Sequence, residues 1–212
     1  MAYTVKEIFY TLQGEGANAG RAAVFCRFSG CNLWTGRERD RADAVCNFCD
    51  TDFVGIGPDG GRFADAEALA VAVENAWRPS VNDDTDRFVV CTGGEPLLQL
   101  DREAIAALHR RGFRVAVETN GTQPAVDGLD WICVSPKAST NLEITSGDEL
   151  KLVYPQPEAM PDRFAGLKFA HFFLQPMDGP LLPETTRAAI EYCLAHPRWR
   201  LSVQTHKVAG VR

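Results

Sequence analysis

Three cysteines between residues 31 and 52 have a spacing that suits metal ligands. Cys46 and Cys49 form a C-x-x-C pair, and fourteen residues separate Cys31 from Cys46. A tight turn points both thiolates of such a pair at one metal centre. Three thiolates leave one position open on a tetrahedral zinc ion or an iron–sulfur cube, and a reactive centre needs an open position. From spacing alone, a structural zinc site with a distant fourth ligand, or a chance C-x-x-C, is an equally good interpretation.

The segment Thr92–Pro96, with the sequence TGGEP, is the second stretch that points to chemistry. Gly93 and Gly94 lack a Cβ atom, so the backbone can press against a ligand where a strand ends. The amides that follow, together with Glu95, offer donors and an acceptor to that ligand. Taken alone, the segment is also consistent with an ordinary strand–helix turn.

Short apolar runs of the kind that forms buried strands recur along the chain. They are Val5–Leu12, Ala22–Phe28, Arg87–Cys91, Arg114–Val117, Trp131–Val134, Leu150–Tyr154, His171–Leu174 and Leu201–Val203. Polar clusters follow five of them: TGGEP, ETNG (Glu118–Gly121), SPK (Ser135–Lys137), QPMD (Gln175–Asp178) and QTHK (Gln204–Lys207). The carboxyl edge of parallel strands carries the active site in α/β proteins. We therefore expect these clusters and the cysteine loop to meet at one mouth.

Helical patterns lie between some of these runs. Asp65 and Asp101 are predicted N-caps, Gly112 is predicted to close the second helix, and Glu184–Ala195 has apolar residues on one face. Alternating strands and helices predict an α/β fold with mostly parallel strands. Because runs outnumber helices, the expected architecture is an incomplete, partial TIM-like barrel. No linker or repeat divides the chain, so residues 1–212 are expected to form a single domain.

Composition sets further bounds on function. The net charge of −6 gives no reason to expect binding to nucleic acid or membrane, and 45% hydrophobic residues is ordinary for a globular protein. The N-terminus lacks the apolar run of a signal peptide, and no stretch has the length of a membrane span. A cytoplasmic location is expected, where free thiols are the rule. The remaining cysteines are expected to be inert core residues: Cys26, Cys91, Cys133 and Cys193.

The combination of a three-cysteine loop and a later strand ending in GGEP resembles the radical S-adenosylmethionine (SAM) superfamily. The usual superfamily loop is C-x-x-x-C-x-x-C, whereas residues 32–45 form a longer charged insert in this chain. Over its whole length the chain is similar to the 7-carboxy-7-deazaguanine synthase family, some of whose members have this wider spacing. The resemblance rests on an ordered set of motifs: FYTLQGEG, FCRFSGCNLW, CDTD, CTGGEP, VETNG, SPK, QPMDG and QTHK.

This resemblance implies a reaction. In the family, 6-carboxy-5,6,7,8-tetrahydropterin undergoes ring contraction with loss of ammonia to 7-carboxy-7-deazaguanine, which feeds queuosine and other 7-deazapurines. A [4Fe–4S] cluster, SAM and Mg²⁺ are the implied cofactors. A homodimer and a small electron-donor protein such as flavodoxin are family expectations.

The resemblance also implies roles for individual residues. Cys31, Cys46 and Cys49 would ligate the cluster. Thr51 would bind Mg²⁺, although a turn-capping hydroxyl is the alternative that the residue alone favours. Glu118 and Asn120 would support Mg²⁺ or SAM indirectly. The residues implied for SAM are Phe48, Cys49, Asp50, Gly94, Ser135, Pro136, Lys137, Gln175, Pro176, Met177 and Asp178.

The residues implied for the substrate lie in five places along the chain. They are Leu12, Gln13, Gly14, Glu15, Arg27, Thr92, His206 and the C-terminal Arg212. Glu15 and His206 are candidates for positioning the substrate, and no residue is singled out as the chemical catalyst. Arg27 suits the substrate carboxylate because arginine on an apolar strand needs an anion, but a structural ion pair is the alternative.

Two competing functions remain open at this point. A glycyl-radical activase also has a small SAM barrel, but its protein substrate gives no need for Gln13, Arg27 and His206. A zinc-stabilised binding protein would use GGEP merely as a turn. The fold of the insert is not predicted.

Overall fold

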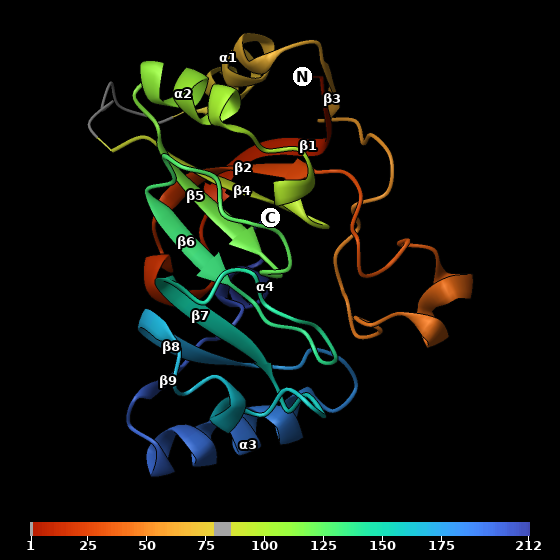
Figure 1. Cartoon of the computed structure of the whole chain (residues 1–212), viewed down its shortest axis with the longest axis vertical. Coiled ribbons are helices and arrows are strands. Elements are labelled where there is room, and N and C mark those ends of the chain that lie inside the picture. Colours follow the sequence, from red (N-terminus) through yellow and green to blue (C-terminus); the bar gives the residue numbers. More distant parts are fainter. Residues whose placement is uncertain (1, 79–85) are drawn as a thin grey trace.

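The computed structural model describes residues 2–78 and 86–212, and its centre is one mixed sheet (Figure 1). In the described chain the strand order is β3-β1-β2-β4-β5-β6-β7-β8-β9. The strands are β1 (Tyr3–Leu12), β2 (Ala22–Phe28), β3 (Gly61–Phe63), β4 (Phe88–Gly93), β5 (Arg114–Thr119), β6 (Trp131–Val134), β7 (Ser146–Tyr154), β8 (Lys168–Pro176) and β9 (Trp199–Leu201).

Most neighbouring strands are parallel. Pairing is parallel from β2 through β4 and onward to β9, and only β1 runs antiparallel to its neighbours β2 and β3. Among the described residues β3 and β9 end the sheet and do not pair with each other. The sheet is therefore not closed, and the predicted α/β, partial-barrel architecture is confirmed.

The helices are α1 (Ala66–Ala76), α2 (Arg102–Arg110), α3 (Leu182–Ala195) and the short α4 (Thr205–Ala209). Both predicted N-caps are confirmed, since Asp65 accepts a hydrogen bond from the Ala68 amide and Asp101 from the Ala104 amide, each at 2.9 Å. Gly112 follows α2 with φ of +76°, a conformation that suits glycine. In the part of the chain that the structure describes, no helix combines the length and apolarity needed to cross a membrane.

Two apolar clusters hold the helices against the sheet. One packs α1 and α2 on β1, β2, β4 and β5, and includes Leu69, Val73, Ile105 and Leu108. The other packs α3 on β7, β8 and β9 around Trp199. Figure 1 shows α1 and α2 together at one end of the molecule and α3 at the other. With the helices at its ends and outer face, the sheet leaves its carboxyl edge open to the loops.

Some elements differ from the sequence prediction. The strand expected at Leu201–Val203 ends at Leu201, so the QTHK cluster begins α4 rather than leaving a strand directly. Strand β3 is only three residues long, which is too short for its periodicity to be recognised. The charged insert forms a 3-10 helix at Glu38–Asp43 and projects from the body in Figure 1.

Candidate active site

A cavity of about 420 Å³ lies where the strand ends, the cysteine loop and the C-terminal segment meet. Its lining includes these residues implied by the sequence: Leu12, Gln13, Gly14, Glu15, Arg27, Cys31, Cys46, Phe48, Cys49, Asp50, Thr51, Thr92, Gly94, Ser135, Lys137, Gln175, Pro176, Asp178, His206 and Arg212. Pro136 and Met177 do not line it. The Pro136 carbonyl accepts from Gln156 at 3.3 Å, and the Met177 amide donates to the Tyr154 carbonyl at 2.8 Å.

The three cysteines of the loop all face this cavity. A hydrogen bond from the Cys46 thiol, acting against partial burial, lowers the pKa of Cys49 to about 6. The same bond, together with burial, raises the pKa of Cys46, while burial raises that of Cys31. Within residues 2–78 and 86–212, no three His, Cys, Asp or Glu side chains form a group that could hold a metal ion. The three thiols thus line the same cavity, but they are not gathered around one point as the ligands of a single zinc ion would be.

Two glycines join the end of β4 to the start of the cysteine loop. A Cβ atom on Gly94 would lie 2.2 Å from the Gly30 carbonyl oxygen and 2.7 Å from the Cys31 Cβ. One on Gly93, whose φ is +143°, would lie 2.2 Å from the Phe28 oxygen. Real Cβ atoms do not approach other atoms this closely, so only glycine lets the strand end lie against Cys31.

The Glu95 side chain of the same motif does not line the cavity. It is fully buried and accepts hydrogen bonds from the Leu97 amide (3.0 Å), the Thr119 hydroxyl (2.8 Å) and the Asn120 amide (2.8 Å). Burial raises its pKa, and these bonds act in the opposite direction. The expectation that Glu95 offers an acceptor to a ligand is therefore wrong. The carboxylate holds the ends of β4 and β5 together instead.

A buried charge network forms the floor of the cavity. Lys151 Nζ lies 2.6 Å from a Glu15 oxygen and 3.2 Å from a Glu118 oxygen, and Gln13 donates to Glu118 at 2.9 Å. Burial favours a neutral Glu15, but it is outweighed by the charge and hydrogen bond of Lys151 together with the Gln204 hydrogen bond and the nearby His206, which lower the pKa of Glu15 to about 2. Burial likewise opposes the charge of Lys151, yet the two carboxylates raise its pKa. We call Gln13, Glu15, Glu118 and Lys151 the floor network.

Lys151 was absent from the sequence prediction. It is 4% exposed, lies in β7 and lines the cavity. The available signal was a single lysine inside the apolar run Leu150–Tyr154, because lysine is almost never fully buried unless it is paired. The same pattern is also typical of a solvent-facing lysine on an amphipathic strand, so the sequence could not show whether Lys151 is buried.

Arg27 and Arg212 share one acidic partner. Arg27 Nε and Arg212 Nη2 each lie 2.7 Å from a Glu7 carboxylate oxygen. Burial raises the pKa of Glu7, but the two guanidinium groups more than offset this and lower it. Arg27 thus makes the structural ion pair that was the alternative to binding the substrate carboxylate, and its side chain also borders the cavity.

Lys207 joins the two sides of the cavity entrance. Its Nζ lies 2.8 Å from Asp50 in the cysteine loop and 2.6 Å from Asp178 after β8. All three side chains are partly exposed, between 35% and 46%. We call Asp50, Asp178 and Lys207 the rim clasp.

The C-terminal segment packs against the turn between β1 and β2. The Thr205 amide and hydroxyl donate to the Gly14 carbonyl at 2.9 and 2.7 Å. A Cβ atom on Gly14 would lie 2.2 Å from His206 Nδ1, so glycine is needed for His206 to lie there. Gln204 donates to Glu15 at 3.0 Å. Residues from both ends of the chain therefore complete one wall.

The loops after β6 and β8 complete the opposite wall. Lys137 Nζ donates to the Ser135 hydroxyl at 2.6 Å and to its carbonyl at 2.7 Å. Gln175 is buried and accepts from Ser202 at 3.2 Å. Thr92 is buried at the end of β4, whereas Leu12 is largely exposed at the entrance.

Comparison with known proteins places this cavity in context. No protein-family model matches the chain. Full-length relatives do: "7-carboxy-7-deazaguanine synthase" of Caulobacter vibrioides is 67% identical, and that of Bordetella pertussis 62%, each over 100% of both chains. The chain belongs to the 7-carboxy-7-deazaguanine synthase family.

The fold agrees with this family membership. The crystal structure of QueE from Escherichia coli superposes with a TM-score of 0.70 at 28% sequence identity, over 96% of this chain and 94% of that one. Members of the family with as little as 31% identity still match nearly the whole chain, as the Neisseria meningitidis protein does. The motifs that suggested the family from sequence thus line one cavity in a chain that belongs to it.

Proposed function

We propose that the chain converts 6-carboxy-5,6,7,8-tetrahydropterin to 7-carboxy-7-deazaguanine with loss of ammonia. The observation that carries this proposal is the meeting of Cys31, Cys46 and Cys49 with the glycines of TGGEP at one cavity. Full-length relatives that bear the enzyme's name support it.

The donor set fits a [4Fe–4S] cluster with one open iron. Three thiols face the cavity, and the pKa of Cys49, about 6, makes its thiolate available near neutral pH. Cys31, Cys46 and Cys49 would hold the cluster; with SAM bound, it would supply the one-electron chemistry that starts the rearrangement. Lys137 lies near enough to Cys46 and Cys49 for its positive charge to favour their thiolates.

The walls next to the cysteines suit SAM. Ser135 and Lys137 present a hydroxyl and an ammonium, Phe48 presents a ring, and Gln175 and Asp178 present polar oxygens to the same cavity. The close packing at Gly94 leaves backbone where a side chain would otherwise fill the space. These groups would orient the ligand beside the cluster and keep water away.

The floor network suits the pterin. Gln13 can both donate and accept, as the edge of a pterin requires, and Glu15 offers an anionic acceptor kept ionised by Lys151. Arg27, Thr92, His206 and Arg212 border the same space. We propose that Thr51 binds Mg²⁺ through its hydroxyl, since Mg²⁺ prefers oxygen ligands and keeps several waters.

Several features of the biological context remain proposals of the same kind. The single mixed sheet supports one radical SAM core domain spanning residues 1–212. A homodimer, a flavodoxin-like electron donor and a cytoplasmic location follow from the family resemblance. Neither nucleic acid nor membrane is a proposed partner, because the net charge is −6.

Turnover under anaerobic conditions tests the function. Reduced protein is incubated with carboxytetrahydropterin, SAM and Mg²⁺, and product is followed by mass spectrometry and ammonia release. We expect 7-carboxy-7-deazaguanine from the wild type and none from Cys49→Ala. Wild-type protein with a full cluster that forms neither product nor ammonia would refute the proposal.

A further inference from the structure

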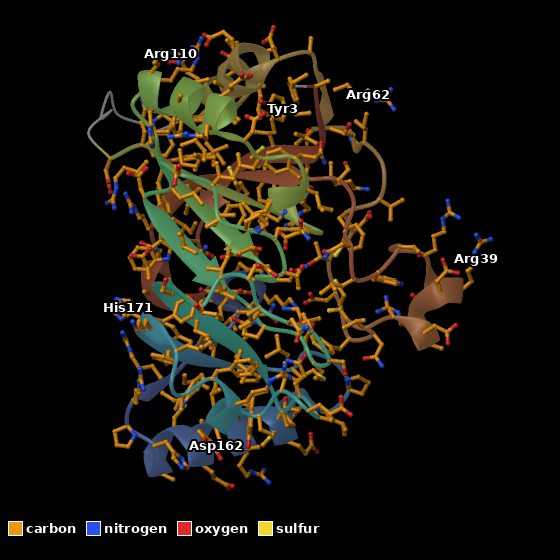
Figure 2. The ribbon with its side chains drawn as sticks, in the orientation of Figure 1. Tyr3, Arg39, Arg62, Arg110, Asp162 and His171 are labelled. Carbon is orange, nitrogen blue, oxygen red and sulfur yellow. The ribbon has the colours of Figure 1, made fainter. Side chains whose placement is uncertain are left out.

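The insert between Cys31 and Cys46 contains one arginine that turns back toward the cysteines. Arg39 and Arg41 both lie on the 3-10 helix Glu38–Asp43, but their side chains are 72% and 31% exposed respectively. Figure 2 shows Arg39 at the outer end of the insert, directed away from the body of the protein. Two arginines of one short helix are therefore in different environments.

Arg41 donates to the backbone of the C-x-x-C turn. Its Nη1 lies 2.8 Å from the Asn47 carbonyl oxygen and 3.0 Å from the Cys49 carbonyl oxygen. Its Nε lies 2.8 Å from Glu38, which holds the guanidinium in place from within the insert. A guanidinium can donate to Glu38 through Nε and to both carbonyls through Nη1 at the same time, whereas a lysine ammonium carries all its hydrogens on one nitrogen and cannot span these partners.

An aromatic pair supports the other side of the same guanidinium. Arg41 lies over the Trp34 ring at 4.2 Å, and Trp34 packs edge-on against Phe53 at 5.7 Å between ring centroids. Trp34 is 8% exposed, and both rings line the cavity. Arg41 is thus fixed between the residues that follow Cys31 and the turn that carries Cys46 and Cys49.

We infer that Arg41 is a positioning residue for the cluster, holding the C-x-x-C turn so that Cys46 and Cys49 face the cavity. This inference rests on the proposed function, because it assumes that the three thiols bind iron. In the usual superfamily loop, three residues separate the first two cysteines, and this short connection keeps them close together. Fourteen residues separate Cys31 from Cys46 in this chain, so we infer that the contacts of Arg41 take over this role. Its positive charge, beside the Cys49 backbone, would also favour the more negative, reduced form of a cluster bound there.

Loss of iron to a chelator tests this role. Wild type, Arg41→Met, Arg41→Lys and Arg39→Met are reconstituted anaerobically, and iron per chain and the rate of iron loss are measured. We expect Arg41→Met to lose iron roughly tenfold faster than wild type, the scale seen when a group supporting a metal ligand is removed. Arg41→Lys should fall between them, and Arg39→Met should behave as wild type.

A spectroscopic readout separates positioning from a general loss of stability. We expect a lower reduction potential and an altered electron paramagnetic resonance signal for the cluster in Arg41→Met, with both unchanged in Arg39→Met. If Arg41→Met does not fold, Arg41→Lys decides by the same measurements. Wild-type rates and spectra in the Arg41 variants would overturn the inference alone, whereas a wild-type chain that takes up no iron would overturn the proposed function and this inference with it.

Discussion

The floor and the rim of the cavity are both held by a lysine between two carboxylates, yet they are built in opposite ways. The side chain of Lys151 on the floor is 5% exposed and comes from strand β7, whereas the side chain of Lys207 on the rim is 39% exposed and comes from α4. The floor joins strands and a tight turn, while the rim joins two loops to the short α4. Breaking a buried ion pair leaves an uncompensated charge and is costly, whereas the groups of an exposed ion pair can separate at little cost because water solvates them.

This contrast indicates a division of labour. The floor network keeps fixed, charged groups where the proposed substrate binds. The rim clasp spans the cysteine loop and the segment after β8, both of which carry residues implied for SAM. A ligand has to pass or displace weak surface contacts at the rim, but it meets a preformed surface at the floor.

The largest effect is expected from removing the floor lysine. Lys151→Met leaves Glu15 and Glu118, which are largely but not fully buried, without their cation, and a broken buried pair costs about 3–5 kcal/mol. Urea unfolding at pH 7 measures this, with Lys168→Met, an exposed lysine at the start of β8, as the control. A Lys151→Met protein as stable as the control would show that the floor is not held by charge.

Acid should weaken the floor through Glu15. Its pKa is about 2 in the folded protein and 4.5 as the ordinary value, so its stabilisation is complete above pH 4.5 and is lost as the pH falls toward 2. The loss amounts to up to about 3 kcal/mol. Unfolding free energies between pH 7 and pH 3 should fall more steeply for wild type than for Glu15→Gln. Parallel curves would contradict the assignment.

The joint between the strands and the cysteine loop should be sensitive to a single methyl group. Gly94→Ala places a Cβ atom against the Gly30 backbone and Cys31, so we expect a loss of about 1–3 kcal/mol. Gly166→Ala is the matched control, since no heavy atom lies within 4 Å of its added Cβ. Thermal unfolding measures the melting temperature of each variant. An equal decrease for Gly94→Ala and Gly166→Ala would contradict the claim that packing at position 94 requires glycine.

The rim should give the smallest effect on stability. Lys207→Met breaks two partly exposed ion pairs, which are worth less than about 1 kcal/mol. Because salt screens exposed charges, the difference from wild type should shrink further in 1 M NaCl, where the screening length is about 3 Å. Urea unfolding at low and high salt measures both points. A loss as large as that of Lys151→Met would erase the distinction between rim and floor.

Much of the scaffold could be predicted because local patterns determine it. The strands Ala22–Phe28 and Trp131–Val134 have the predicted bounds, and the capping aspartates lie where their spacing indicated. The site residues could be named because an ordered set of motifs resembles a known family, and they were expected to lie together because those motifs follow strands that end at one edge. Their meeting at one cavity was predicted, but the contacts among them were not.

The remaining contacts depend on residues far apart in the chain. Lys151 meets Glu15 across 136 positions, and Lys207 meets Asp50 across 157. No local pattern shows that Arg27 pairs with Glu7, or that Glu95 turns inward to Thr119 and Asn120. The insert lacks apolar periodicity, so its 3-10 helix and the inward turn of Arg41 required the structure.

The account depends most directly on what the three thiols bind. The measurement that tests this is metal and sulfide analysis of the chain purified without oxygen. The account predicts a brown protein with about four irons and four sulfides per chain, which Cys49→Ala fails to assemble. A colourless protein with a single tightly bound zinc would contradict it.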